Sequence, residues 1–280
     1  MRATTIKITI LIATLGLLVI SWALFRLANS DLYKAKEPTF LLDVGAYNEL
    51  NEDNEIFKTD RIFLYKLSFS DKFEQKTLCL QPKVTGVGYD LIPAGEISSN
   101  VKYCIDYIRL SVFRNKGDTN LGETQTIIKY DFFDGERKVF LGEKTGVVED
   151  STKIFLHPPR SHFFFFNQFN PFPFVRFPIE ESEYWEFEFR IPEHALEKVQ
   201  RLRIPTLKIM YKLSSKEQIR SPWGLLDCYK FIATGLNDEI ETRSIYLFNP
   251  KYGFLRMEFW TIEGVKIEMT LIDISMTIPD

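Results

Sequence analysis

The residues best suited to chemistry gather in one segment, residues 157–178, with the sequence HPPRSHFFFFNQFNPFPFVRFP. Five prolines interrupt it, and because proline breaks interior helices and strands, the sequence predicts a loop. Loops run over protein surfaces, so this many phenylalanine rings need an apolar partner. We therefore interpret the segment as a candidate contact for an apolar or lipid-like ligand. The candidate ligand-binding residues are Phe163, Phe164, Phe165, Phe166, Phe169, Phe172, Phe174, Arg160 and Arg176.

Three kinds of partner could cover these rings. The loop could fold back and fill the domain's own core, it could line a cavity for an apolar ligand, or it could meet a membrane surface or another protein. Phenylalanine favours apolar partners over carbohydrate, because sugar platforms usually use Trp or Tyr with a polar handle. Arg160 and Arg176 could meet a phosphate or carboxylate head group. Their alternative role is that of solvated surface charges.

Sequence motifs for catalysis and metal binding are missing. His157 and His162 lie five residues apart on the same segment, and no third ligand is apparent, so we expect no metal and no cofactor. The chain contains no G-x-S-x-G elbow, no H-E-x-x-H and no Walker motif. The glutamates between residues 180 and 188 fit the solvated face of a strand better than a glycosidase pair. We expect a protein that is not an enzyme, and a hydrolase without a visible motif stays an alternative.

The N-terminus predicts a membrane anchor. Residues 8–25, ITILIATLGLLVISWALF, carry no charge and follow Arg2 and Lys7. As a helix they would span about 27 Å, close to the roughly 30 Å core of a bilayer. A cleaved signal peptide with its cut before Asp31, or a buried core helix, remains open. Basic residues flank the apolar run on both sides, but the run has the form of a signal anchor, so we expect the bulk of the chain to be extracytoplasmic, in the periplasm or cell envelope.

The three cysteines are Cys79, Cys104 and Cys228. The odd number leaves at least one thiol free in a monomer. Cys79 and Cys104 both lie in strand-like runs and could pair in an oxidising compartment, and three buried free thiols are the alternative. Without a C-x-x-C motif, neither a redox site nor a zinc ribbon is indicated.

Alternating apolar residues dominate the rest of the chain. In residues 183–191, EYWEFEFRI, every second side chain from Trp185 is apolar, which is typical of a half-buried antiparallel strand. The same period recurs in residues 206–213 and 265–273, and one helix is predicted over 192–202. The pattern predicts an all-β antiparallel meander of roughly a dozen strands that forms a sandwich, a barrel or a strongly curved sheet, preceded by one N-terminal transmembrane helix.

The predicted organisation has three parts. Residues 1–30 form the anchor, residues 31–60 a polar tether, and residues 61–280 a β-rich domain with a possible lobe break at 158–182. Neither half of the domain region is basic: residues 31–150 hold 16 basic against 21 acidic residues, and residues 151–280 hold 16 against 17. A nucleic-acid partner is therefore not expected.

The closing meander, FLRMEFW followed by VKIEMTLID, resembles the curved sheets of exported lipid-carrier proteins of bacterial envelopes. This likeness is one of fold style over the last third of the chain. The expected function is that of a membrane-anchored extracytoplasmic binding module for an apolar ligand or an envelope protein. A structural or scaffolding protein of the envelope with no small-molecule ligand is the main alternative.

Overall fold

The computed structural model describes residues 54–71, 76–82, 89–96, 104–113, 125–135, 137–179, 184–199 and 202–276. The predicted anchor, residues 1–30, and most of the predicted tether lie outside these residues. Within them, no helix has the length and apolar character needed to cross a bilayer. The strands are β1 (Arg61–Asp71), β2 (Thr77–Pro82), β3 (Tyr89–Pro93), β4 (Tyr107–Val112), β5 (Thr126–Asp134), β6 (Arg137–Glu149), β7 (Lys153–Leu156), β8 (Phe174–Arg176), β9 (Tyr184–Arg190), β10 (Thr206–Ser221), β11 (Gly224–Leu236), β12 (Glu241–Asn249), β13 (Gly253–Trp260) and β14 (Val265–Met276).

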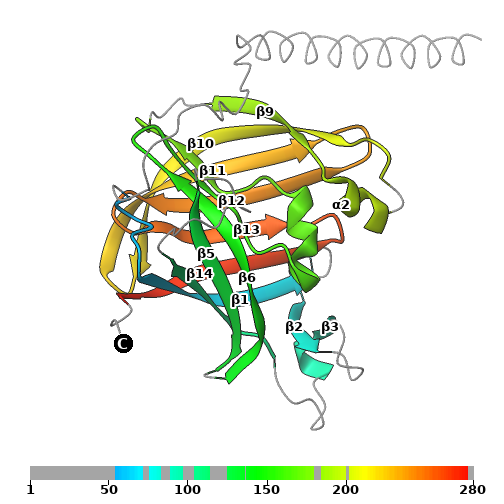
Figure 1. Cartoon of the computed structure of the whole chain (residues 1–280), viewed down its shortest axis with the longest axis horizontal. Coiled ribbons are helices and arrows are strands. Elements are labelled where there is room, and N and C mark those ends of the chain that lie inside the picture. The colour runs from blue at the N-terminus through cyan, green and yellow to red at the C-terminus, as the bar shows by residue number, and fades with distance from the viewer. Residues whose placement is uncertain are drawn as a thin grey trace, which may run out of the picture. The chain divides into compact units, whose positions relative to one another are not determined.

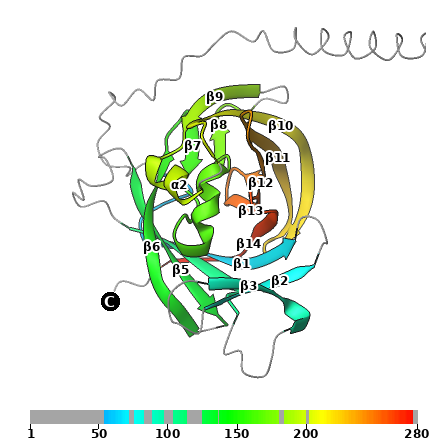
Figure 2. The ribbon, with the colours of Figure 1, turned by 90° about the vertical axis from the view of Figure 1, so that its right-hand side faces the viewer.

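All of these strands belong to one antiparallel sheet, so the prediction of an all-β meander is confirmed. Its order is β8-β7-β6-β5-β4-β1-β14-β13-β12-β11-β10-β9, with the β2–β3 hairpin attached beside β1. The first strand therefore lies between β4 and the last strand and joins two meanders. Figure 2 shows the strands curving around a central segment. Among the described strands no pairing joins β8 to β9, so the architecture is a strongly curved sheet that does not close.

The alternating sequence pattern sets which face of each strand is buried. In β9 the Trp185 ring is 4% exposed, while Glu188 and Arg190 on the opposite face are exposed. In β10, Leu207, Ile209, Tyr211 and Leu213 are buried, and β14 repeats the pattern. The predicted inward faces are therefore confirmed.

Irregularities in register lie along the strands that curve. Pairing shifts by a residue between Leu64 and Tyr65 in β1, between Leu213 and Ser215 in β10, and between Leu247 and Phe248 in β12. Such bulges bend a strand and increase its twist. The bulges therefore contribute to the curvature of the sheet.

The helices partly correct the sequence prediction. The helix expected over 192–202 is present as α2 (Glu193–Lys198), directly after Pro192. Two 3₁₀ helices were not predicted, η1 (Ala94–Glu96) and η3 (His162–Phe169). The prediction that the phenylalanine-rich segment is a plain loop is wrong over η3, because the stretch between Pro159 and Pro171 contains no proline and is free to coil.

Residues 54–57, at the end of the predicted tether, pack on the sheet. Ile56 and Phe57 are buried, at 2% and 0% exposed. The Glu149 carboxylate, at the end of β6, accepts hydrogen bonds from the backbone N–H groups of Glu55, Ile56 and Phe57 at 2.7–2.9 Å. These bonds fix residues 54–57 on the sheet. The possible lobe break was placed at residues 158–182. There the chain leaves the sheet after β7 and returns to it in β8, which pairs with β7 at the edge of the sheet.

A disulfide joins Cys79 in β2 to Cys104, just before β4, with their Cα atoms 5.6 Å apart. The disulfide links the β2–β3 hairpin to the residues that lead into β4. Cys228 is free and buried, and burial, helped by the charges of Asp227 and Glu217, raises the pKa of its thiol to about 11. Of the two alternatives left open by the sequence, the structure has the Cys79–Cys104 pair.

The disulfide should contribute measurably to stability. It closes a loop with a sequence separation of 25 residues, and a loop of that size gives about 3 kcal/mol by restricting the unfolded chain. We expect the Cys79→Ser/Cys104→Ser double variant to lose about this much free energy of unfolding in a urea titration. The unmodified chain under reducing conditions should show the same loss, and a loss below about 1 kcal/mol in both would contradict the prediction.

Candidate functional site

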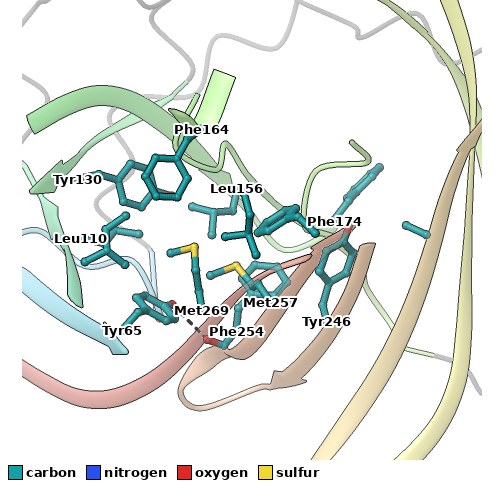
Figure 3. Close-up of a cluster of buried hydrophobic side chains, with 14 of the residues drawn as sticks. Tyr65, Leu110, Tyr130, Leu156, Phe164, Phe174, Tyr246, Phe254, Met257 and Met269 are labelled. Carbon is teal, nitrogen blue, oxygen red and sulfur yellow. Dashed lines mark hydrogen bonds between the residues drawn. The ribbon is translucent and has the colours of Figure 1, made fainter. Parts of the chain in front are cut away.

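The phenylalanine-rich segment lies inside the curve of the sheet and not on its surface. Phe164 and Phe169 are 0% exposed. The Phe164 ring stacks on Phe132 of β5, with ring centroids 5.0 Å apart. Figure 3 shows Phe164 and Phe174 directed into one cluster with Tyr65 and other core side chains. The domain's own core, the first of the three possible partners, therefore covers most of these rings.

Hydroxyl groups on the concave face satisfy the carbonyls of the buried segment. The Pro171 carbonyl accepts hydrogen bonds from Tyr246 Oη at 2.7 Å and Ser244 Oγ at 2.9 Å. The Phe172 carbonyl accepts one from Tyr211 Oη at 2.9 Å. Burial raises the pKa of both tyrosines well above the ordinary value, so their hydroxyls stay protonated and able to donate.

The backbone ahead of η3 and the end of η3 are attached in the same way. Thr242 Oγ1 donates to the Phe169 carbonyl at 2.7 Å, and Tyr130 Oη donates to the His157 carbonyl at 2.8 Å. Asn170 Nδ2 donates to two strand carbonyls, those of Arg243 and Trp260, at 3.1 Å each. Because these bonds connect residues distant in sequence, they set the position of the segment against the sheet.

One side of η3 borders a cleft of about 550 Å³. This volume falls within the range of small-molecule sites, about 300–1,000 Å³. Phe165 is 8% exposed and packs edge to face on Phe166, which is half-buried, with ring centroids 5.7 Å apart. The residues that line the cleft are Arg160, Ser161, His162, Phe165, Phe166, Gln168 and Val199.

Arg160 places a positive charge at this cleft. Its Nη2 donates to Thr145 Oγ1 at 3.1 Å, and its guanidinium lies over the Phe172 ring, 5.6 Å from the centroid. The Glu143 carboxylate accepts hydrogen bonds from the backbone N–H groups of Arg160 and Ser161 at 2.7 and 2.8 Å. Glu143 thus fixes the backbone from which the guanidinium extends.

The structure divides the candidate residues from the sequence into three places. Arg160, Phe165 and Phe166 line the cleft. Arg176 lies elsewhere, with its guanidinium 5.9 Å from the Trp185 ring centroid. Five rings belong to the core or pack against it, namely Phe163, Phe164, Phe169, Phe172 and Phe174.

The sequence interpretation omitted four cleft residues. Three of them lie on the phenylalanine-rich segment itself, namely Ser161, His162 and Gln168. Their polar side chains among phenylalanine residues were the sequence signal that could have identified them. Val199 adjoins the end of α2, and only the tertiary structure brings it to the cleft.

His157 is packed between aromatic rings beside this site. Its ring makes edge contacts with Phe155 and Phe172, at centroid distances of 5.2 and 5.4 Å. Burial, with a smaller contribution from the charge of Arg160, lowers the pKa of His157 to about 3. The ring is therefore neutral at physiological pH.

The buried carboxylate of Asp131 connects strands β4, β5 and β6. Asp131 is 2% exposed and forms ion pairs with Arg109, Lys129 and Lys138 at 2.7–3.1 Å. Burial opposes its ionisation, but hydrogen bonds from Lys138, Arg109 and Lys129 outweigh burial and hold its pKa below the usual value. This cluster stabilises the sheet. In the part of the chain that the structure describes, no group of three or more His, Cys, Asp or Glu is arranged to hold a metal ion.

The fold and the site together define an all-β protein whose curved sheet holds a buried phenylalanine-rich segment. No protein-family model matches the chain, and no curated protein matches it. Among solved structures, it is similar to a candidate lipoprotein of Parabacteroides distasonis, with 9% identity and a TM-score of 0.40 over 79% of this chain and 97% of that chain.

Two further solved structures are similar at the same level. One is a candidate exported protein of Bacteroides fragilis with a YmcC-like fold, with 9% identity and a TM-score of 0.35 over 78% of this chain and 96% of that chain. The other is the hypothetical lipoprotein YmcC of Escherichia coli, with 10% identity and a TM-score of 0.31 over 79% and 91%. These likenesses identify neither a ligand nor a reaction for this chain.

Tyr246 and Ser244 both donate to the Pro171 carbonyl, so their contributions to stability should be coupled. Tyr246→Phe leaves Ser244 Oγ in place and should cost about 1 kcal/mol of unfolding free energy, and Ser244→Ala should cost about as much. The double variant leaves a buried carbonyl without its two donors and should cost about 1–3 kcal/mol beyond the sum of the single losses. Urea titrations of the four chains measure this difference, and strictly additive losses would contradict the shared role.

Acid should destabilise the domain through His157. An unfolded histidine has a pKa near 6.5, whereas that of His157 in the folded chain is about 3. Between these values the unfolded state binds more protons, so the free energy of unfolding falls as the pH decreases, by at most about 1.4 kcal/mol per unit. We expect His157→Gln to lose less stability than the unmodified chain between neutral pH and about pH 4.5 in urea titrations. Equal losses would show that His157 does not contribute.

Proposed function

We propose that this chain is a membrane-anchored, extracytoplasmic binding module without catalytic activity, and that the cleft beside η3 takes a lipid-like molecule with an anionic head group. The observation that carries the proposal is the combination of an apolar floor and a positive charge in one cleft, from Phe165, Phe166 and Arg160. A ring-lined cleft with a few polar groups is the usual form of a small-molecule site.

The polar groups of the cleft favour an anionic head group. The Arg160 guanidinium can donate two parallel hydrogen bonds to a carboxylate or phosphate. Ser161 and Gln168 add neutral hydrogen-bonding groups on the same lining. The nearby Glu143 carboxylate accepts the backbone N–H groups of Arg160 and Ser161 and is not part of the lining, whereas Arg160 is.

The proposed location has separate support. The Cys79–Cys104 disulfide is of the kind that persists in oxidising compartments such as the periplasm, and it is rare in the cytosol. The apolar residues 8–25 are long enough, as a helix, to anchor the chain in a bilayer.

A scaffolding role in the envelope is the second candidate. It is favoured by the burial of Phe164, Phe169, Phe172 and Phe174 in the domain's own interior, because these rings then serve architecture. In that case the cleft has no resident ligand, and a fixed protein partner should be recovered by cross-linking in whole cells.

Ligand binding can be tested with a fluorescent fatty acid titrated into the purified full chain. We expect Arg160→Gln to raise the dissociation constant about 10-fold or more, because a charged hydrogen bond is worth about 1.5–3 kcal/mol. Arg176→Gln is the matched control: it removes the same charge from the same segment, outside the cleft, and should leave binding unchanged.

A third variant separates the apolar floor from the charge. Val199→Trp should fill the cleft and reduce binding while Arg160 is intact, with circular dichroism confirming that the fold is retained. The proposal fails if the unmodified chain does not bind the probe, or if Arg176→Gln weakens binding as much as Arg160→Gln.

A further inference from the structure

Three of the most exposed large apolar side chains share one end of the domain. Among the described residues the highest exposures of this kind are those of Leu225 at 65%, Met276 at 58% and Phe113 at 42%. They come from β11, β14 and the end of β4, far apart in the sequence. An exposed apolar side chain alone is ordinary, but a group at one end calls for an explanation.

Phe113 and Met276 both lie beside the start of β1. Asp60, just before β1, donates its backbone N–H to the Val112 carbonyl at 3.0 Å, and Phe113 is the next residue. Met276 is the register partner of Arg61, the first residue of β1. Both therefore flank the point at which the chain enters the sheet.

The tip of the β10–β11 hairpin reaches the same place. The Trp223 ring stacks on Tyr252 in the β12–β13 turn, with centroids 4.7 Å apart and an interplanar angle of 13°. A Cβ atom on Gly253 in that turn would lie 2.7 Å from Cγ2 of Ile56, so the turn touches the first described residues of the chain. We call this region, made of residues 54–57, the β12–β13 turn and the β10–β11 tip, the proximal end. In Figure 1 these blue, orange and yellow segments lie on the left of the domain.

Positive charge accompanies the exposed leucine. Arg220 is exposed directly across the hairpin from Leu225, and Lys251 is exposed in the adjoining turn, 5.0 Å from the Tyr252 ring centroid. The acids of the hairpin are engaged within it: Glu217 pairs with Lys230 at 2.9 Å, and the Asp227 carboxylate accepts a hydrogen bond at 2.8 Å.

We propose that the proximal end rests on the anionic surface of the membrane that holds the anchor, with Leu225 inserted among the lipid head groups and Arg220 and Lys251 facing their phosphates. This inference rests on the anchor of the proposed function. Trp and Tyr are enriched at such interfaces, as at Trp223 and Tyr252. Basic residues near an anionic leaflet are attracted to its surface.

The course of the chain favours the membrane as the occupant. Residues 26–53 separate the proposed span from Asn54, and even fully extended they reach at most roughly 100 Å. The described chain begins at the proximal end, with Asn54, so this end is joined most directly to the tether. A tethered contact forms at high effective concentration, so a few side chains suffice. The distal end, where α2 and the cleft lie, would then face away from the bilayer.

The contact can be tested with an environment-sensitive fluorophore on an introduced cysteine. Leu225→Cys and Leu236→Cys are a matched pair, because both leucines are exposed, at 65% and 39%, and lie near opposite ends of β11. Cys228 is buried and its pKa is raised to about 11, so it should stay unlabelled, and the unmodified chain checks this. The full chain is reconstituted into vesicles of phosphatidylcholine with and without phosphatidylglycerol.

We expect the label at position 225 to shift to the blue and to be quenched by spin-labelled lipid in anionic vesicles, with no change at position 236. Arg220→Gln/Lys251→Gln should reduce the shift at least severalfold. If the chain floats with the vesicles but the labels at positions 225 and 236 respond equally, the proposed contact is wrong and the anchor is unaffected. A chain that does not float with vesicles would overturn the anchor, and the contact with it, while fatty-acid binding would still report on the cleft.

Discussion

The structure depends on burying an irregular, proline-rich backbone inside a curved sheet. A buried carbonyl without a hydrogen-bond donor costs about 1–3 kcal/mol, so residues 157–173 could not occupy the interior unsupported. The concave face supplies the donors as side chains: Tyr246 and Ser244 at Pro171, and Tyr211 at Phe172. The sheet and the segment therefore specify each other.

The prolines of the segment help to meet this constraint. Proline has no backbone N–H, so each one removes a buried donor that would need an acceptor. At Pro171 the carbonyl oxygen remains, and the hydroxyls of Tyr246 and Ser244 donate to it. The phenylalanine rings between the prolines then fill the concavity, and a cleft lies beside η3, where Phe165 and Phe166 meet Val199.

The topology gives the two ends of the domain different characters. Because β1 pairs with both β4 and β14, the chain enters at the seam between the two meanders. Leu225 lies at the proximal end and Met276 and Phe113 lie beside the start of β1, whereas the cleft with Arg160 lies beside α2. The cleft and the most exposed apolar side chains therefore lie at different ends of the domain.

The sequence by itself determined the local features of this protein. The alternating residues of β9, β10 and β14 defined their buried faces, because a strand turns every second side chain to the same side. Helix α2 followed from its proline and its composition, and the Cys79–Cys104 pair was one of two options. The phenylalanine-rich segment was recognised as unusual, and three of the nine candidate residues chosen from the sequence line the cleft.

Only the tertiary structure decided where that segment goes and what it forms. Its hydrogen-bond partners lie far away in sequence: Tyr246 is 75 residues from Pro171, and Thr242 is 73 from Phe169. No local pattern of residues reports on contacts of that range. The same holds for the short helix η3 and for Val199 in the cleft. The sheet's curvature and strand order bring these groups together, and both arise from packing over the whole domain.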